Sequence, residues 1–192
     1  SKLLPPKPDA KALAALPDDR VLAEMTKRVF CAGFVWRVIE QKWPGFEEAF
    51  LHFEPKRLLF QPDEYWEGLA RDTRIVRNPQ KIRSVRENAD FVSDAGKKTK
   101  GFGKLLAEWP EDDQVGLTEF LAKGGSRLGG MTGQYFLRFV GYDSFILSRD
   151  VVACLREAGV ELSEKASSKK DMRAAQAAVA TWRKESGLSY VQ

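Results

Sequence analysis

The stretch RLGGMTGQY, from Arg127 to Tyr135, has the residue types of an anion-binding turn. Gly129, Gly130 and Gly133 lie between two segments with helical patterning. Glycine permits positive φ and lets a foreign group come close to the backbone. The N–H groups of such a turn, with the N-terminus of the following helix, can hold a phosphate. No Gly-Lys-Ser/Thr follows and no strand precedes, which excludes a P-loop and a dinucleotide fingerprint. A plain interhelical turn is the alternative interpretation.

A carboxylate, Asp150, follows at the start of the next predicted helix. A carboxylate can serve as a general base or stabilise developing positive charge. An aspartate at a helix start is also a common N-cap. The residue type alone therefore leaves a catalytic and a capping role open.

The segment CAGFVW, from Cys31 to Trp36, places two aromatic residues at a break between two amphipathic stretches. Phe34 at the tip of a turn either folds back into the core or points at something flat. The same two alternatives apply to Trp36.

Composition limits the classes of protein. The chain has 192 residues, 43% hydrophobic and 30% charged, which is typical of one globular domain or two small lobes sharing a cleft. No apolar run approaches the roughly 18 residues of a membrane span. Two cysteines and one histidine, His52, are too few for a disulfide scaffold or a four-ligand zinc site, so we expect a reducing compartment and no metal. A packing or surface role is favoured for His52 over catalysis. The net charge of +4 permits nucleic-acid binding.

Helical spacing of apolar residues recurs along the chain without strand alternation, which predicts an all-α fold of about ten short helices. Residues 1–17 read as an N-terminal arm with one short helix, and residues 18–192 as a single helical domain. Asp18 is expected to cap a helix that ends at Gly33. The next helix is expected to stop at Pro44.

Two later helices carry clear terminal signals. Asn78 and Pro79 have the types expected at an N-cap and a first helical position. Ser168 and Asp171 form a predicted capping box at the start of the last helix, which should end at Gly187.

The glycine-rich turn and Asp150 together resemble the helix-hairpin-helix superfamily of DNA glycosylases. This resemblance implies a two-lobed fold around a cleft, with the helix-hairpin-helix at about 119–141, backbone amides that grip DNA phosphates, and Asp150 as the catalytic carboxylate. Members that also cleave the strand carry a nucleophilic lysine just after the hairpin glycines, where this chain has Thr132. The resemblance therefore implies a monofunctional enzyme that hydrolyses the N-glycosidic bond and leaves an abasic site.

Two further motifs resemble 3-methyladenine DNA glycosylase I. That family shows Ile-Ile-Arg-Asn-x-x-Lys-Ile, then Asn-Ala, and Ala-Gly-Leu-x-Trp. This chain has IVRNPQKIRSVRENA at 75–89 and AGFVW at 32–36. The resemblance covers residues 18–95 well and 125–158 loosely. The positions that match the longer motif in register are Arg77, Asn78, Lys81, Ile82, Asn88 and Ala89.

The resemblance also implies roles at the site. An enzyme that acts on a base must extrude it, and apolar wedges inserted between base steps help. Phe34 is expected to be that wedge and Trp36 a stacking wall of the base pocket, which Phe30, Cys31 and Arg28 also line. The predicted phosphate contacts are Arg127, Gly129, Gly130, Met131, Thr132, Gly133 and Lys81.

The chain departs from the family in three ways. It lacks the N-terminal segment that supplies pocket aromatics, and it lacks the ligands of the family's zinc, so we expect no zinc. Arg28 stands where the family has a pocket carboxylate, and an arginine would repel a cationic methylated adenine. Glu24, one turn earlier, could pair with Arg28.

The sequence therefore predicts a cytoplasmic, nucleoid-associated enzyme of base-excision repair without a cofactor. Its expected partner is double-stranded DNA that contains a damaged base, an alkylated purine. No membrane and no obligate protein partner are inferred. The alternatives are a non-catalytic helix-hairpin-helix DNA-binding protein and a glycosylase for a neutral lesion.

Overall fold

The computed structural model describes residues 4–192, which form eleven α-helices and one short 3-10 helix and contain no strand. The predicted all-α class is confirmed. The elements in chain order are α1 (Ala10–Ala14), α2 (Asp18–Cys31), α3 (Trp36–Ala49), η1 (Leu51–Phe53), α4 (Pro55–Leu59), α5 (Asp63–Leu69), α6 (Pro79–Gly96), α7 (Phe102–Glu108), α8 (Gln114–Gly124), α9 (Gly130–Val140), α10 (Arg149–Glu157) and α11 (Lys169–Ser186).

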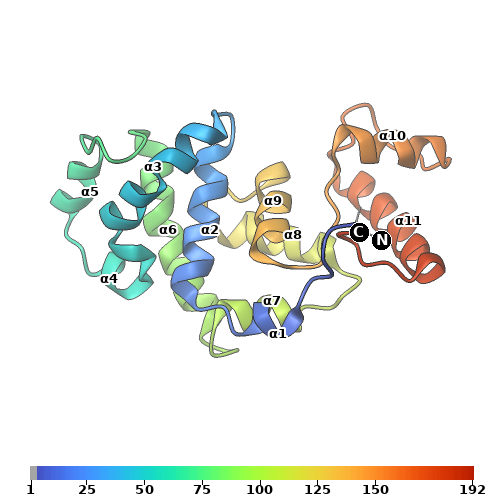
Figure 1. Cartoon of the computed structure of the whole chain (residues 1–192), viewed down its shortest axis with the longest axis horizontal. Coiled ribbons are helices and arrows are strands. Elements are labelled where there is room, and N and C mark those ends of the chain that lie inside the picture. Colours follow the sequence, from blue (N-terminus) through green and yellow to red (C-terminus); the bar gives the residue numbers. More distant parts are fainter. Residues whose placement is uncertain (1–3) are drawn as a thin grey trace.

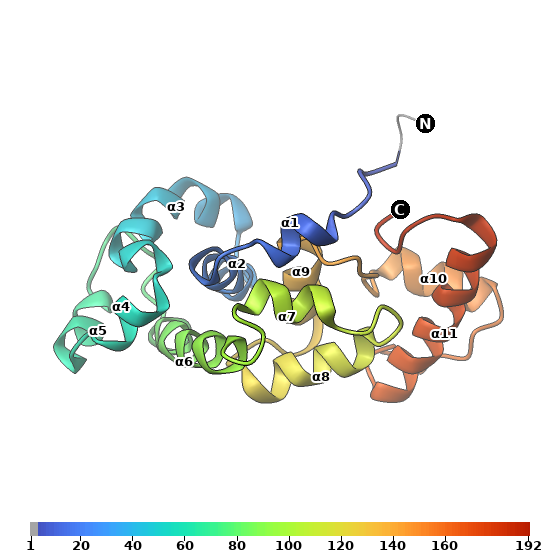
Figure 2. The same cartoon turned by 90° about the horizontal axis from the view of Figure 1, so that it is seen from below.

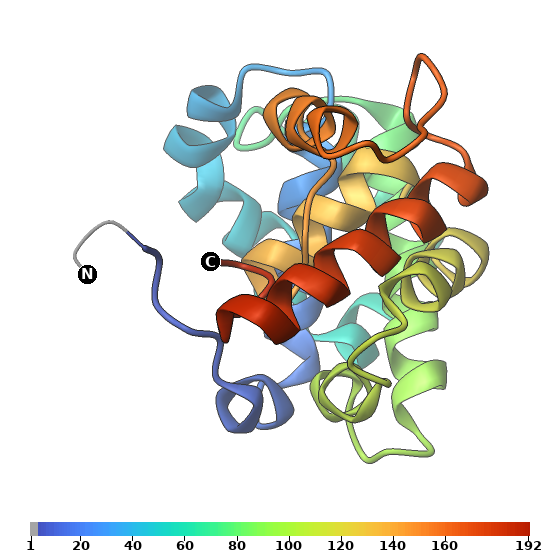
Figure 3. The same ribbon diagram turned by 90° about the vertical axis from the view of Figure 1, so that its right-hand side faces the viewer.

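Apolar side chains form three clusters. The helices that contribute them follow one another along the long axis of the molecule (Figure 1). The first cluster joins α2 to α3, α4, α5 and α6. The second joins α2 to α1, α6, α7, α8 and α9, and the third joins α8 to α10 and α11. Figure 3 shows the helices of the third part from their own side, with α11 crossing in front of the central helices. The shared helices α2 and α8 therefore connect the three parts.

Helix α2 divides its surface three ways. Val21, Met25 and Val29 are buried in the second cluster. Leu22 and Phe30 are buried in the first. Since both core-facing strips follow helical spacing, a third strip stays outside the core. That strip carries the less buried side chains Glu24, Lys27, Arg28 and Cys31.

Helix α3 does not stop at Pro44, and this prediction was wrong. The helix continues to Ala49 with Pro44 inside it. A proline removes one helical hydrogen bond. Continuation of the helix beyond it buries Phe46 completely in the first cluster, and burial of such a ring contributes about 1.5–3 kcal/mol. Tertiary packing offsets the local penalty here.

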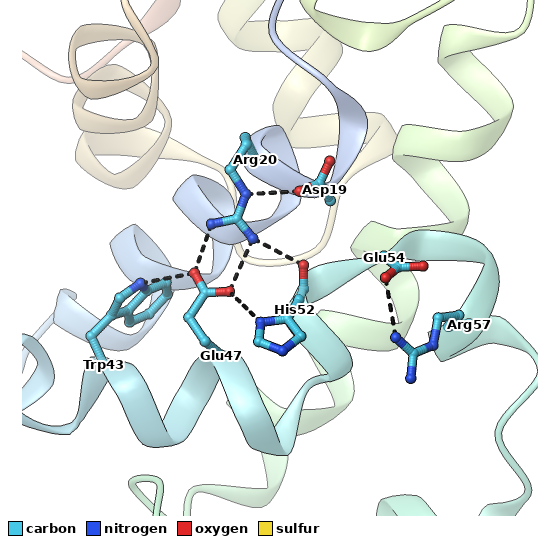
Figure 4. A network of polar contacts seen from close by, with 7 residues as sticks. All are labelled: Asp19, Arg20, Trp43, Glu47, His52, Glu54 and Arg57. Carbon is cyan, nitrogen blue, oxygen red and sulfur yellow. Dashed lines mark hydrogen bonds and ion pairs between the residues drawn. The ribbon is translucent and has the colours of Figure 1, made fainter.

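A polar network connects the C-terminal end of α3 to the start of α2 (Figure 4). Leu51–Phe53 all have φ between 53° and 57°, and a left-handed residue costs about 1–2 kcal/mol. Arg20 donates to both carboxylate oxygens of Glu47, at 2.8 and 2.9 Å, and to the His52 carbonyl at 2.9 Å. Trp43 also donates to Glu47. These bonds raise the pKa of Arg20 and hold the strained turn in place. The His52 side chain is 65% exposed, as a surface role requires.

The described part of the N-terminal arm packs onto the body. Helix α1 lies against α7, as Figure 2 shows from below. Leu13 is buried there, and a Cβ on Gly103 would come within 2.5 Å of the Leu13 carbonyl oxygen. Gln192 donates to the Pro5 carbonyl at 3.0 Å. Residues 5–14 of the described chain therefore contact the rest of the structure, and the division at residue 17 stays a prediction.

Most of the predicted helix ends are confirmed. Asn78 accepts from the backbone of α6, and Ser168 with Asp171 forms the capping box of α11, which ends at Gly187 in the left-handed region. Asp18 is not an N-cap, contrary to the prediction. Its carboxylate accepts instead from the first N–H of α7 at 2.8 Å, because α7 packs against the start of α2.

Candidate active site

A cavity of about 830 Å³ opens between α2, α3 and α9. The exposed strip of α2 forms one wall, the first turns of α3 form a second, and α9 forms a third. The cavity contains five of the residues predicted for the site, because the α2–α3 turn and the start of α9 meet at its mouth. Its lining comprises Glu24, Lys27, Arg28, Cys31, Ala32, Gly33, Trp36, Glu40, Met131, Thr132, Tyr135 and Phe139.

Helix α9 is apolar on two faces. One face buries Phe136 and Leu137 in the second cluster. The other follows the spacing i, i+4, i+8, and its side chains are 40%, 41% and 56% exposed at Met131, Tyr135 and Phe139. A helix needs only one apolar face to join a core, so a second one marks a binding surface. It supplies the cavity with two flat rings.

Four charged side chains line the cavity and pair with one another. Arg28 Nε lies 2.8 Å from Glu24 Oε1, and Lys27 Nζ lies 2.8 Å from Glu40 Oε1. The predicted pairing of Arg28 with Glu24 is confirmed. Burial raises the pKa of Glu24, and the charge of Arg28 opposes that rise. The guanidinium of Arg28 also lies 4.1 Å from the ring centroid of Phe139. The cavity thus contains two positive and two negative groups.

The turn between α2 and α3 exposes its aromatic residues. Gly33 has φ +66°, and the Phe34 N–H donates to the Cys31 carbonyl at 3.1 Å. Phe34 is 45% exposed and Trp36 59% exposed. Trp36 lines the cavity, whereas Phe34 does not, although Gly33 and Trp36 in the same turn do. Neither ring belongs to the core.

Lys81 and Phe30 do not have the surroundings predicted for them. Lys81 is 7% exposed, and its ammonium donates to the carbonyls of Phe30 at 3.1 Å and Ala32 at 2.7 Å. Burial lowers the pKa of this ammonium. Lys81 therefore holds the end of α2 and is not available to a phosphate. Phe30 is fully buried with its ring 4.8 Å from that of Phe46, so it lies behind the cavity wall and not in it.

The hairpin between α8 and α9 is fixed from α6. Asn88 is fully buried, donates to the Ser126 carbonyl at 3.0 Å and accepts from the Ser126 N–H at 2.7 Å. Arg127 follows with φ +59° and an exposed side chain that donates to Gln80 at 3.2 Å. The two helices run from 114 to 140, so the first begins before the predicted boundary at about 119.

The glycines of the hairpin have different roles. A Cβ on Gly133 would overlap the Leu128 carbonyl oxygen, so Gly133 is required for packing and does not face a ligand. Gly129 is the N-cap of α9, and Gly130 has φ +57° with open space where a Cβ would be. Within residues 4–192 no side chain caps this helix start. The first N–H groups of α9, including that of Thr132, therefore point outward without a side-chain acceptor.

A second groove of about 550 Å³ continues from the cavity toward α10 and α11 and shares Met131 and Tyr135 with it. Arg149 lines this groove, and the next residue in the chain, Asp150, lies in the first turn of α10. Asp150 is exposed and lines neither cavity nor groove. The N-cap of α10 is Ser148, so Asp150 does not cap its helix.

Seven residues of the cavity lining were not among the predicted site residues, namely Glu24, Lys27, Ala32, Gly33, Glu40, Tyr135 and Phe139. Tyr135 and Phe139 could have been found, because apolar residues on α9 occur at positions that cannot all face one side. Lys27 and Glu40 carried no comparable signal. Their pairing depends on how α2 and α3 pack.

No three His, Cys, Asp or Glu side chains within 4–192 are grouped so that they could hold a metal ion. Cys31 and Cys154 are free thiols, and burial raises the pKa of Cys31. None of the described helices is long and apolar enough to span a bilayer.

Comparisons with known proteins agree with this architecture. A sequence profile described as methyladenine glycosylase matches residues 14–119, more than half of the chain. No curated protein matched. One similar solved structure is a 3-methyladenine DNA glycosylase I, with a TM-score of 0.58, 18% identity, and 70% of this chain and 81% of that chain covered.

Two further solved structures share the fold. The 3-methyladenine DNA glycosylase I from Staphylococcus aureus has a TM-score of 0.59 and 21% identity over 69% of this chain and 81% of that one. A variant of 3-methyladenine DNA glycosylase I in complex with 3-methyladenine has a TM-score of 0.56 and 23% identity over 75% and 84%. Because the family profile covers more than half of the chain, the protein belongs to the methyladenine glycosylase family and is a DNA N-glycosylase.

Proposed function

We propose that this protein is a monofunctional glycosylase that hydrolyses the N-glycosidic bond of a damaged purine in duplex DNA. The observation that carries the proposal is the cavity between α2, α3 and α9, which adjoins a glycine hairpin with an uncapped helix start. Its volume of about 830 Å³ lies in the range of small-molecule sites and is ample for one extruded nucleotide.

The hairpin would hold the DNA backbone. The outward N–H groups at Gly129, Gly130, Met131 and Thr132 combine with the positive end of the α9 dipole, which favours a phosphate. Gly130 leaves the approach open, since nothing lies within 4 Å of the place of a Cβ. Arg127, exposed in the same hairpin, adds charge.

The α2–α3 turn would act on the base stack. Extrusion of a base costs a few kcal/mol, and an apolar side chain that fills the vacated space lowers that cost. Phe34 lies in the turn between Gly33 and Trp36, which both line the cavity, and it is 45% exposed. The extruded base would then stack on the exposed ring of Trp36 or on the rings of α9, where stacking contributes about 1–3 kcal/mol.

Bond cleavage would rely on Asp150. The cavity and the second groove meet at Met131 and Tyr135, so a nucleotide with its base in the cavity would direct its sugar toward the start of α10. A carboxylate there can stabilise the sugar cation and orient a water molecule. We infer hydrolysis over strand cleavage because Thr132 stands where strand-cleaving members of the superfamily carry a nucleophilic lysine. Lys27 is the single lysine among the described residues that line the cavity and is paired with Glu40, although Lys165 and Lys169 line the second groove.

The test is single-turnover excision on duplex DNA that carries defined damaged purines, followed by alkali to reveal abasic sites. We expect abasic sites without strand breaks before alkali. Breaks before alkali would contradict the monofunctional assignment. Tight duplex binding with no excision of any tested lesion would favour a non-catalytic DNA-binding protein. The observation that favours this alternative is that Asp150 is exposed and lies outside the cavity lining.

A further inference from the structure

Arg28 presents an unused hydrogen-bonding edge to the cavity. Its Nε is buried against Glu24 at 2.8 Å, and its side chain is only 13% exposed. Its guanidinium lies 4.1 Å from the ring centroid of Phe139, which fixes the plane of the group. Within residues 4–192 the contacts of its guanidinium are that of Nε with Glu24 and that with the Phe139 ring, its two terminal nitrogens donate no hydrogen bond, and Arg28 lines the cavity. A planar pair of donors is therefore held in place at the wall without an acceptor.

The charges of the cavity do not favour a cation. Glu24 is neutralised by Arg28, and Glu40 is neutralised by Lys27. A positively charged base would meet no uncompensated carboxylate and would be repelled by the guanidinium at short range. A neutral base with two adjacent acceptors would instead receive two charge-assisted hydrogen bonds, which are stronger than neutral ones.

We propose that Arg28 determines the specificity of this site and selects a neutral purine that carries oxygen at C6 and an unmodified N7. This proposal rests on the proposed glycosylase function and names the substrate class of the same cavity. The guanidinium has five donors and no acceptor. It matches the adjacent O6 and N7 acceptors of a 6-oxopurine in a bidentate manner.

Other purines match the guanidinium less well. A 6-aminopurine turns its N6 donor toward the guanidinium, which leaves one pair of donors facing each other. A purine methylated at N7 loses that acceptor and gains a positive charge. Undamaged guanine has the same two acceptors, but it is held in a stable pair with cytosine. A mispaired lesion costs less to extrude, so the extrusion step separates the two.

The experiment measures base release by the full-length chain under single-turnover conditions. One substrate is a duplex with hypoxanthine, a neutral 6-oxopurine, opposite thymine. The other is methylated duplex DNA, from which 3-methyladenine and 7-methylguanine are separated by chromatography. A duplex with guanine opposite cytosine is the negative control. We expect hypoxanthine to be released faster per lesion than either methylated base, and guanine not to be released.

The outcomes separate this proposal from the proposed function. Release of 3-methyladenine without hypoxanthine would overturn the role of Arg28 and leave the glycosylase function intact. Release of none of these bases, with duplex binding retained, would overturn both. Release of hypoxanthine ahead of the methylated bases supports both.

Variants locate the effect on the guanidinium. Arg28→Met alone would leave Glu24 buried without its partner, so it is combined with Glu24→Gln. The double variant should release hypoxanthine roughly 5- to 150-fold more slowly, the effect of one bidentate contact to a base. Its release of 3-methyladenine should be unchanged or faster. Arg71→Met, at an exposed arginine remote from the cavity lining, is the matched control. If the double variant fails to fold, the wild-type comparison still decides.

Discussion

The two hydrogen bonds between Asn88 and Ser126 attach the hairpin to α6, and their contribution to the free energy of unfolding can be measured. Asn88→Ala removes both of them, at 3.0 and 2.7 Å, and leaves the Ser126 N–H and carbonyl without partners. A buried polar group that loses its partner costs about 1–3 kcal/mol. Because Ser126 is only half buried, water recovers part of this, and we expect a loss of about 2–4 kcal/mol in the free energy of unfolding. For a chain of this length that lowers Tm by about 4–16 °C.

Asn88→Asp gives a second, pH-dependent measurement. The carboxylate keeps the acceptor for the Ser126 N–H but has no donor for the Ser126 carbonyl, and it is buried. The folded state therefore prefers the protonated acid, which raises the folded pKa above the unfolded value of about 3.9. The stability of this variant should be greatest below that value and fall as pH rises through the folded pKa. Wild-type Asn88 does not titrate and should show no such step.

The assay is urea unfolding followed by circular dichroism, with duplex affinity at fixed salt measured alongside. Ser84→Ala is the matched control, since Ser84 is buried on the same helix and its hydroxyl donates within α6, away from the hairpin. Its cost should be near 1 kcal/mol, with unchanged affinity. An Asn88→Ala variant within about 0.5 kcal/mol of wild type would refute the attachment. Lower stability with unchanged affinity of the folded variant would refute the hairpin as the DNA grip.

Four further tests have defined outcomes. Phe34→Ala should slow excision but cost less than the roughly 3–5 kcal/mol of a core phenylalanine, because the ring is 45% exposed, and a core-sized loss in urea unfolding would contradict the wedge. Gly130→Val and Gly141→Val, both at positive φ with open space for a Cβ, should cost similar stability, yet only the first should weaken duplex binding by anisotropy. Asp150→Asn should lower single-turnover excision about a hundredfold with unchanged unfolding, and equal rates would remove its catalytic role. Two serine residues hold the pKa of Asp171 well below its usual range, so its contribution to stability is present above about pH 4 and lost below it, and Asp171→Asn should flatten that acid limb.

The helices and their ends were predictable where local chemistry decides them. Asn78 with Pro79, and Ser168 with Asp171, satisfy helix starts through neighbouring residues, so sequence alone contains the information. Pro44 was misread because its penalty is local whereas the gain from burying Phe46 is tertiary.

The site was predictable where one helix face is enough. Arg28 and Cys31 fall on the outer strip of α2, and the same periodicity places Phe30 inside with Leu22, a signal that the resemblance overrode. Lys81 could not be placed from sequence. A lysine normally reads as surface charge, and nothing local indicates that two carbonyls of another helix lie within reach of its ammonium.

Helix α6 positions both of the turns that are proposed to face DNA. Lys81 holds the carbonyls at the end of α2, from which the Phe34 turn starts, and Asn88 holds the hairpin ahead of α9. The two residues are seven apart, so they lie on one face of the helix, separated by two turns. Because a helix is stiff over that length, the proposed wedge, Phe34, and the hairpin keep a fixed separation. The residues that most clearly mark the family in this chain thus act by positioning, and the side chains proposed to touch the base, such as Arg28, lie on other helices and can change without loss of the frame.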